Sequence, residues 1–205
     1  MLAATAGPGD SAVDTTASLR LKLQLRTGGW TFDGAYQLIG MRSELLPLDG
    51  LPNDDHRLFG LTDVIDRSGD HALLHRLDRL WVGYASEKTV VRLGRQALSW
   101  GNGLAYAPMD LVNPFDPAAI DTEYKAGDDM LYLQYLQDSG NDLQAAVVVR
   151  RNPLTGEVES EQATVAVKYH GFVGASEYDL LLAEHYDDLV LGLGGTYSLG
   201  GAVLR

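Results

Sequence analysis

Several kinds of residue and segment are missing from this sequence. It has no cysteine in 205 residues, which excludes disulfide frameworks, thiolate metal sites and cysteine nucleophiles. The absence suits the cytoplasm and also suits envelope proteins that avoid stray thiols in an oxidising compartment. Basic residues are scarce, since 16 Lys and Arg stand against 28 Asp and Glu for a formal net charge of −12. Because no basic block is present to neutralise phosphates, nucleic acid is not an expected partner.

Long hydrophobic runs are also missing. No stretch of about 18 apolar residues occurs, so no transmembrane helix is expected. A membrane β-barrel stays open as a class, because its strands need only about 9–11 residues each. Residues 1–7 are too short for a signal peptide and lack a basic segment, so a targeting sequence is not part of this sequence. We predict a flexible leader over 1–16 and a β-barrel segment over 17–205.

The residues that are present alternate in a period of two, which is the pattern of a half-buried β-strand. Residues 18–27 give the clearest case, and Gly28-Gly29 turns the chain into a second alternating run at 30–38. The first run has one face of leucine and one polar face: Leu19, Leu21, Leu23 and Leu25 against Arg20, Lys22, Gln24 and Arg26.

About ten strands are predicted along the chain, with no helix long enough for a parallel crossover. The segment 71–84 fits a helix by its leucine spacing and a strand by its later alternation, and we favour a strand from about Arg76. The other predicted strands after residue 38 are 89–99, 130–137, 143–150, 163–170, 177–186, 190–197 and a last one after Gly200-Gly201.

The lengths of the predicted connections alternate. Every second connection of an up-and-down sheet lies at the same end, so one end would have tight turns and the other longer loops, as in outer-membrane barrels. The tight turns are 28–29, 86–88, 138–141, 171–175 and 199–201, and the connections between them are 40–72, 100–128, 152–160 and the short 187–188.

Alternation alone does not say which face of the sheet is inside. A soluble barrel or sandwich turns leucine inward, whereas an outer-membrane barrel turns it toward lipid. The long strands, the one-sided loops and the aromatic residues near strand ends favour the membrane form. These aromatic residues are Trp30, Tyr84, Tyr135, Tyr169, Tyr178, Tyr186 and Tyr197.

One segment carries a specific motif. It runs from Leu93-Gly94-Arg95-Gln96 through Trp100-Gly101 and Pro108-Met109-Asp110 to Asn113-Pro114-Phe115-Asp116. The segment resembles the "GRQ…WG…NP.D" stretch of uncharacterised porin-like outer-membrane proteins of Gram-negative bacteria, and is more loosely similar to alginate-export and phosphate-selective porins. The resemblance implies an all-β, antiparallel, up-and-down transmembrane β-barrel in the cell outer membrane. A closed barrel of that kind needs more strands than these, so we expect an incomplete barrel and a fragment.

The candidate functional residues follow from this interpretation. If the leucine faces meet lipid, the cationic strand residues face the lumen and oppose acidic residues of a loop, 100–128, that folds inward and constricts the pore. The alternative is that the arginines tether this loop through charge-assisted hydrogen bonds. Arg95 breaks the alternation, which a β-bulge or a position at the rim would resolve. The candidates are Arg20, Lys22, Arg26, Arg92, Arg95, Gln96, Asp110, Asn113 and Asp116.

Other groupings carry less chemistry. The acidic pairs 54–55, 128–129 and 187–188 offer oxygen ligands for Ca²⁺, but none has the spacing of a calcium loop, so solvated loop charge is the expected role. His71 and His75 would form a metal pair only on a helix. His170, Ser176 and Asp179 match no nucleophile motif. We predict neither metal, cofactor nor catalysis.

The expected function is a channel or transport barrel for small polar or anionic solutes, with outer-membrane lipid as a partner and a second copy of the chain as a further candidate partner. The alternatives are a barrel enzyme, a plugged structural barrel and a soluble β-sheet binding protein.

Overall fold

A computed structural model gives the architecture, and it describes residues 2–5, 14–43, 51–100, 108–114, 125–199 and 202–204. Nearly all of the regular structure is β, with one short 3₁₀ turn, η1, at Ser160–Gln162. Among the described residues no helix is long and apolar enough to cross a membrane. The strands are β1 (Leu2–Thr5), β2 (Asp14–Thr27), β3 (Trp30–Arg42), β4 (Thr62–Ser68), β5 (His71–Ala85), β6 (Thr89–Gln96), β7 (Asp128–Leu136), β8 (Asp142–Val148), β9 (Thr164–Val173), β10 (Ser176–His185), β11 (Asp188–Leu199) and β12 (Ala202–Leu204).

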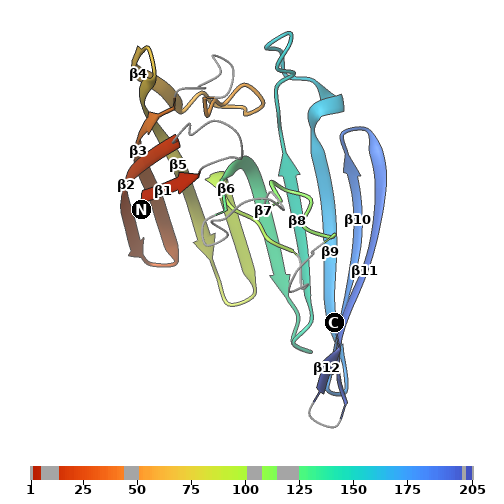
Figure 1. Cartoon of the computed structure of the whole chain (residues 1–205). Helices are drawn as coiled ribbons and strands as arrows, with labels where there is room; N and C mark the ends of the chain where they lie inside the picture. Colours follow the sequence, from red (N-terminus) through yellow and green to blue (C-terminus); the bar gives the residue numbers. More distant parts are fainter. Residues whose placement is uncertain are drawn as a thin grey trace.

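All of these strands belong to one antiparallel sheet (Figure 1). Neighbours in the sheet follow one another along the chain, except that β3 pairs with β5 and the short β4 pairs with β5 alone. The prediction of an all-β, antiparallel, up-and-down arrangement is therefore confirmed. No pairing among the described strands joins the β1–β2 side to the β11–β12 side, so the sheet is open.

The longer connections lie at one end of the sheet, which also carries the short β4–β5 and β10–β11 turns. The turns β2–β3, β5–β6, β7–β8 and β9–β10 lie at the other end, at the bottom of Figure 1, and we call it the turn end. The longer connections β3–β4, β6–β7 and β8–β9 lie at the opposite end, which we call the loop end. This is the one-sided distribution that the sequence predicts.

Three boundaries differ from those predicted. Strand β5 begins at His71, so the helical alternative for 71–84 is wrong, and the strand extends five residues before Arg76. The segment 40–72, which is rich in acidic residues, was predicted to be a connection without a strand. It contains strand β4, which forms a hairpin with β5. The expected leader, 1–16, contains β1 and the first residues of β2. Intrinsic residue preferences are a poor guide to these three segments, because pairing with a neighbouring strand decides their conformation.

One face of the sheet, the apolar face, carries apolar side chains on every long strand from β2 to β11 and is interrupted on β10 by Glu184, which stands opposite Val165. In each row the residues listed below stand directly opposite one another on neighbouring strands, and the two rows together cross the sheet from β2 to β11. The first row is Leu25, Phe32, Val82, Leu93, Leu131, Val147 and Val165, and the second is Leu133, Ala145, Val167, Leu182 and Leu191. Many of these side chains are exposed, Leu93 at 59% and Leu191 at 74%.

Aromatic side chains line the turn end of the apolar face. Trp30 stands opposite Tyr84 with ring centroids 5.1 Å apart, and Tyr169 and Tyr178 are 6.0 Å apart. Tyr135 and Tyr197 lie on the same face and are about half exposed. The expected row of aromatic residues at strand ends thus forms at the turn end. Tyr186 is different, because it sits in the β10–β11 turn at the loop end.

The opposite face, the polar face, carries the charged and amide side chains of the same strands. Its hydrophobic core forms over β7 to β10, where Met130, Ala146 and Leu181 are buried. The other side of this core is not a second sheet but the connection between β6 and β7, from which Trp100 and Val112 are buried against the strands. The described part of the connection thus covers the polar face over β7 to β10.

Candidate functional site: the polar face and its packed loop

The β6–β7 connection is anchored to the polar face by apolar side chains. Leu98, Trp100, Met109 and Val112 are at most 9% exposed. The Met109 side chain reaches β11, where a Cβ on Gly194 would lie 2.5 Å from its Cε atom. Glycine in β11 therefore makes room for the loop, and the described part of the loop packs on the polar face of the sheet.

Polar contacts hold the same loop. The Trp100 indole Nε1 donates to Gln144 Oε1 at 2.6 Å, and Lys168 Nζ donates to the Trp100 carbonyl at 3.4 Å. Lys125 Nζ donates to the Leu98 carbonyl and, at 2.5 Å, to Asp110 Oδ1. Burial lowers the pKa of Lys125, and the hydrogen bond and charge of Asp110 offset this only in part. Each contact replaces water on a buried polar group, so these described parts of the loop are fixed parts of the fold.

The predicted loop residues are placed as follows. Asp110 pairs with Lys125 of its own connection, so its carboxylate is engaged inside the loop. Asn113 Nδ2 donates to the Gly127 carbonyl at 3.3 Å, and its backbone is left-handed at φ 46°. Asp116 lies outside the described residues, as do 101–107 and 115–124 of the predicted constriction.

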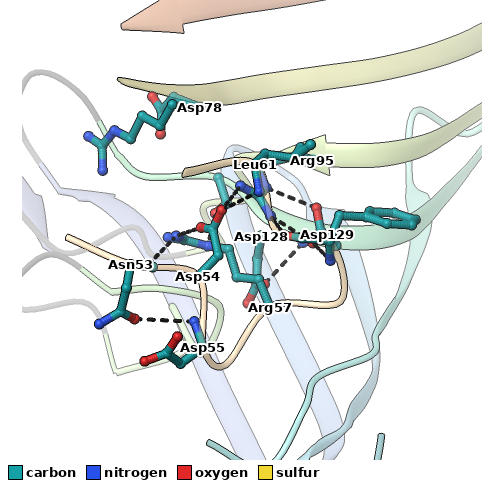
Figure 2. Close-up of polar contacts among 12 residues, drawn as sticks. Asn53, Asp54, Asp55, Arg57, Leu61, Asp78, Arg95, Asp128 and Asp129 are labelled. Atoms are coloured by element: carbon teal, nitrogen blue, oxygen red, sulfur yellow. Dashed lines mark hydrogen bonds and ion pairs between the residues drawn. The ribbon is translucent and has the colours of Figure 1, made fainter. Parts of the chain in front are cut away.

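A second centre is a buried network of charges at the loop end (Figure 2). Arg95 Nε and Nη2 donate to the two oxygens of Asp129, both at 2.9 Å. Arg95 Nη1 donates to Asp54 Oδ2 at 3.0 Å. Arg57 Nη1 donates to Asp54 Oδ1 at 2.5 Å. The Arg95–Asp129 contact is a bidentate pair, the strongest geometry that a guanidinium makes with a carboxylate.

The network continues to β8 and β9. Arg150 binds Asp128 through Nε at 3.0 Å and Nη2 at 2.9 Å. Arg150 Nη1 donates to Thr164 Oγ1 at 2.8 Å, and its guanidinium lies 5.0 Å from the centre of the Tyr186 ring. Three arginines and three aspartates thus neutralise one another. The network joins residues 51–61 to the ends of β6, β7 and β8.

Asp54 shows how the network controls ionisation. Burial alone would raise the pKa of this carboxyl, but hydrogen bonds from Arg57, Arg95 and the Leu61 amide outweigh burial and hold the pKa below its ordinary value of 3.8. The carboxylate is therefore ionised at neutral pH. A charge-assisted contact of this kind stabilises the folded chain only while the acid stays deprotonated.

This network decides the role of Arg95. Its side chain is 2% exposed, and it also donates to the Phe59 carbonyl at 2.5 Å. Arg95 lies in register with Leu80 and Asp129 near the loop end of the sheet, one residue before the end of β6. Its contacts are those of a tether, and among the described residues they reach Asp54 and Phe59 of the segment 51–61.

The remaining cationic candidates lie on the polar face of β2, β5 and β6. Arg20 Nη2 is 3.8 Å from Asp78 Oδ2, and Asp78 is the extra residue of a β-bulge opposite β3. Arg79 Nη1 is 3.6 Å from the same oxygen. Lys22 of β2 stands opposite Ala35 of β3, which in turn stands opposite Arg79 of β5. Arg79 of β5 was not among the predicted residues, yet it lies with Arg20 and Lys22 on the polar face. The bulge at Asp78 shifts the alternation of β5 by one residue and so places Arg79 on this face.

The last candidates divide between structure and surface. Gln96 is buried and its Nε2 donates to the Met130 carbonyl at 3.3 Å, so it links β6 to β7. Arg92 lies over the rings of Trp81 and Tyr132, 5.4 and 5.0 Å from their centroids. Arg26 is exposed near the turn end.

Metal and catalytic groupings gain no support. The described residues hold no group of three His, Asp or Glu side chains suited to a metal, and the arginine network engages Asp54, Asp128 and Asp129. His170 Nδ1 lies 2.9 Å from Asp179 Oδ1. Ser176 is three residues from Asp179 on β10, and this odd spacing puts the two on opposite faces, so no triad forms.

Comparison with known proteins finds no match to this chain among protein-family models, curated proteins or solved structures. The functional proposal therefore depends on the physical chemistry of the two faces.

Proposed function

We propose that this chain forms part of an outer-membrane β-barrel whose polar face lines a passage for small polar or anionic solutes. The observation that carries the proposal is the apolar face, on which exposed leucines, valines and aromatics run across every long strand. Soluble monomers rarely expose an apolar patch larger than a few hundred Å². Lipid is the partner that such a face suits, with aromatic residues at one interface.

The two ends of the sheet also suit a barrel inserted in one direction. The longer connections are all at the loop end, and the connections at the turn end are all short, as expected for external loops and periplasmic turns. In lipid every backbone amide needs a partner, so the two open sides of the sheet, along β1–β2 and along β11–β12, require further strands to close the barrel.

The packed β6–β7 loop is the proposed constriction. Its described part covers the polar face over β7 to β10 and accepts a hydrogen bond from Arg79 Nη2 at the Lys125 carbonyl. Beside it lie Arg20 and Arg92, the cationic side chains of β2 and β6. A passage beside cationic side chains favours anions through its electrostatic field.

Planar-bilayer recording of the full protein tests the proposal. We expect stepwise ion conductance whose reversal potential in a salt gradient shows a preference for chloride over potassium. Arg92→Ala should shift this selectivity toward the cation with little effect on folding. Properly inserted protein that conducts no ions would leave a plugged barrel as the better account, and protein that is monodisperse without detergent would overturn the membrane proposal.

A further inference from the structure

A hollow of about 380 Å³ lies at the turn end, beside β2, β3, β5 and β6. Arg26, Thr31, Gly83 and Arg92 line it and stand in one row across these strands, each opposite the next. The row explains the hollow, because two long cationic side chains flank two small residues. The volume is in the range of sites for small organic molecules, about 300 Å³ and above.

Arg92 is held in place without the use of its hydrogen-bond donors. Its guanidinium lies over Trp81 of β5 and Tyr132 of β7, the two strands that flank β6. Within the described part of the chain, no hydrogen bond or ion pair engages this guanidinium. A stacked guanidinium keeps its donors at the edge of its plane, so it can bind a carboxylate or phosphate in a bidentate manner with little further loss of freedom.

Gly83 is required for this arrangement. A Cβ at this position would lie 2.9 Å from the Trp81 ring and 3.0 Å from Cγ of Arg92. Such distances are too short for carbon atoms in contact, which prefer about 3.5–4.0 Å. The absence of a side chain at Gly83 thus lets the Trp81 ring and the Arg92 stem lie side by side over β5.

The lining of the hollow is cationic in a protein that is strongly acidic overall. Arg26 and Arg92 both line it, and none of the described residues that line it carries a carboxylate. The nearby Asp33 accepts a hydrogen bond from Gln24 Nε2 at 3.0 Å. The local charge therefore attracts anions.

We propose that this hollow binds a small organic anion through its carboxylate or phosphate group, with Arg92 as the bidentate donor and Arg26 as a second positive charge. The inference deepens the proposed function by giving the anionic solute a binding site. The site is distinct from the buried network at the loop end, whose charges neutralise one another.

Calorimetric titration of the full chain in detergent micelles at low ionic strength tests the site, with benzoate and inorganic phosphate as probes and uncharged benzamide as the control ligand. We expect saturable binding of at least one anion and none of benzamide. Arg92→Gln should weaken binding by about 10- to 100-fold, the usual effect of losing a charged hydrogen-bonding partner. Arg92→Lys keeps the positive charge but loses the two parallel N–H donors of the guanidinium. The affinity of this variant should therefore lie between those of the unmodified chain and Arg92→Gln.

Two further variants keep the outcome decisive. Arg26→Gln changes an exposed residue and leaves the Arg92 stack intact, and it should weaken binding by about threefold to tenfold through the lost charge. Lys88→Gln removes an exposed positive charge at the same end, in the β5–β6 turn where Lys88 pairs with Asp138, and should leave affinity unchanged. Absence of saturable binding, or equal affinity in all variants, would overturn the proposal.

The result also separates this site from the channel. Ion conductance without binding that depends on Arg92 would overturn the anion site and leave the channel. If the inserted protein conducts no ions but binds anions in a way that depends on Arg92, the anion-site proposal would be supported and the channel proposal overturned.

Discussion

Replacing Arg95 by methionine should destabilise the protein strongly. Arg95 is the only described cation that contacts both Asp54 and Asp129, and all three side chains are at most 4% exposed. Methionine fills a similar length but donates no hydrogen bond. Arg95→Met therefore leaves the bidentate site on Asp129 and one oxygen of Asp54 without their cation, inside the fold.

The expected loss is about 3–5 kcal/mol of unfolding free energy, because removal of one partner strands a buried charge. A matched control is Arg42→Met, since Arg42 pairs with Asp70 at 3.0 Å but its side chain is 65% exposed. An exposed pair contributes about 0–1 kcal/mol. Urea unfolding of both variants in the same micelles, followed by circular dichroism, measures the two losses. Equal losses for Arg95→Met and Arg42→Met would refute the tether.

The pH dependence of this stabilisation follows from Asp54. Its pKa in the folded chain lies below the ordinary 3.8, so its contribution is fully present above the unfolded pKa and is lost as pH falls through the folded pKa. The difference in stability between the unmodified chain and Asp54→Asn should therefore be constant from pH 7 to about 5 and shrink below about 4. A difference that grows on acidification would contradict the assignment.

Two other substitutions test the faces and the sheet. Leu182→Lys on the apolar face should cost about 2–4 kcal/mol for folding into liposomes if this face meets lipid; Leu154→Lys, at a loop position 93% exposed, should have no effect, and equal yields of both variants would argue against lipid contact. Gly94→Ala should destabilise by at least about 1–3 kcal/mol, because φ is +121° and a Cβ would lie 2.3 Å from the Leu80 carbonyl oxygen, whereas Gly60→Ala, with no atom within 4 Å, should be close to neutral; equal melting temperatures would show that the backbone at β6 relaxes.

The sheet itself was largely predictable from the sequence. Alternation such as that of Leu19 to Arg26 fixes both the strand and its two faces, because a strand repeats every two residues. Hairpin turns at positions such as Gly28-Gly29 then fix which strands are neighbours. Strand β4 was missed since its acidic residues mimic a loop, and its conformation comes from pairing with β5.

The buried network was less predictable for a physical reason. Arg95 contacts Asp54 and Asp129 across 41 and 34 residues of sequence. Acidic pairs in loops look alike whether they are solvated or buried, so only the fold shows which cation reaches them. The sole signal in the sequence was that Arg95 interrupts an apolar alternation. The bulge at Asp78 likewise has no local signal, and it decides that Arg79 reaches the polar face.

The most direct test of the central claim is the environment of adjacent residues on β2. Because the chain has no cysteine, single cysteines at Leu21 and Leu23 and at Lys22 and Gln24 can each carry one spin label, and all four positions are exposed. In liposomes we predict that labels at Leu21 and Leu23 relax faster with oxygen, which concentrates in lipid, and that labels at Lys22 and Gln24 relax faster with a water-soluble nickel chelate. Equal access of the nickel chelate to all four positions would contradict the claim that the apolar face meets the membrane.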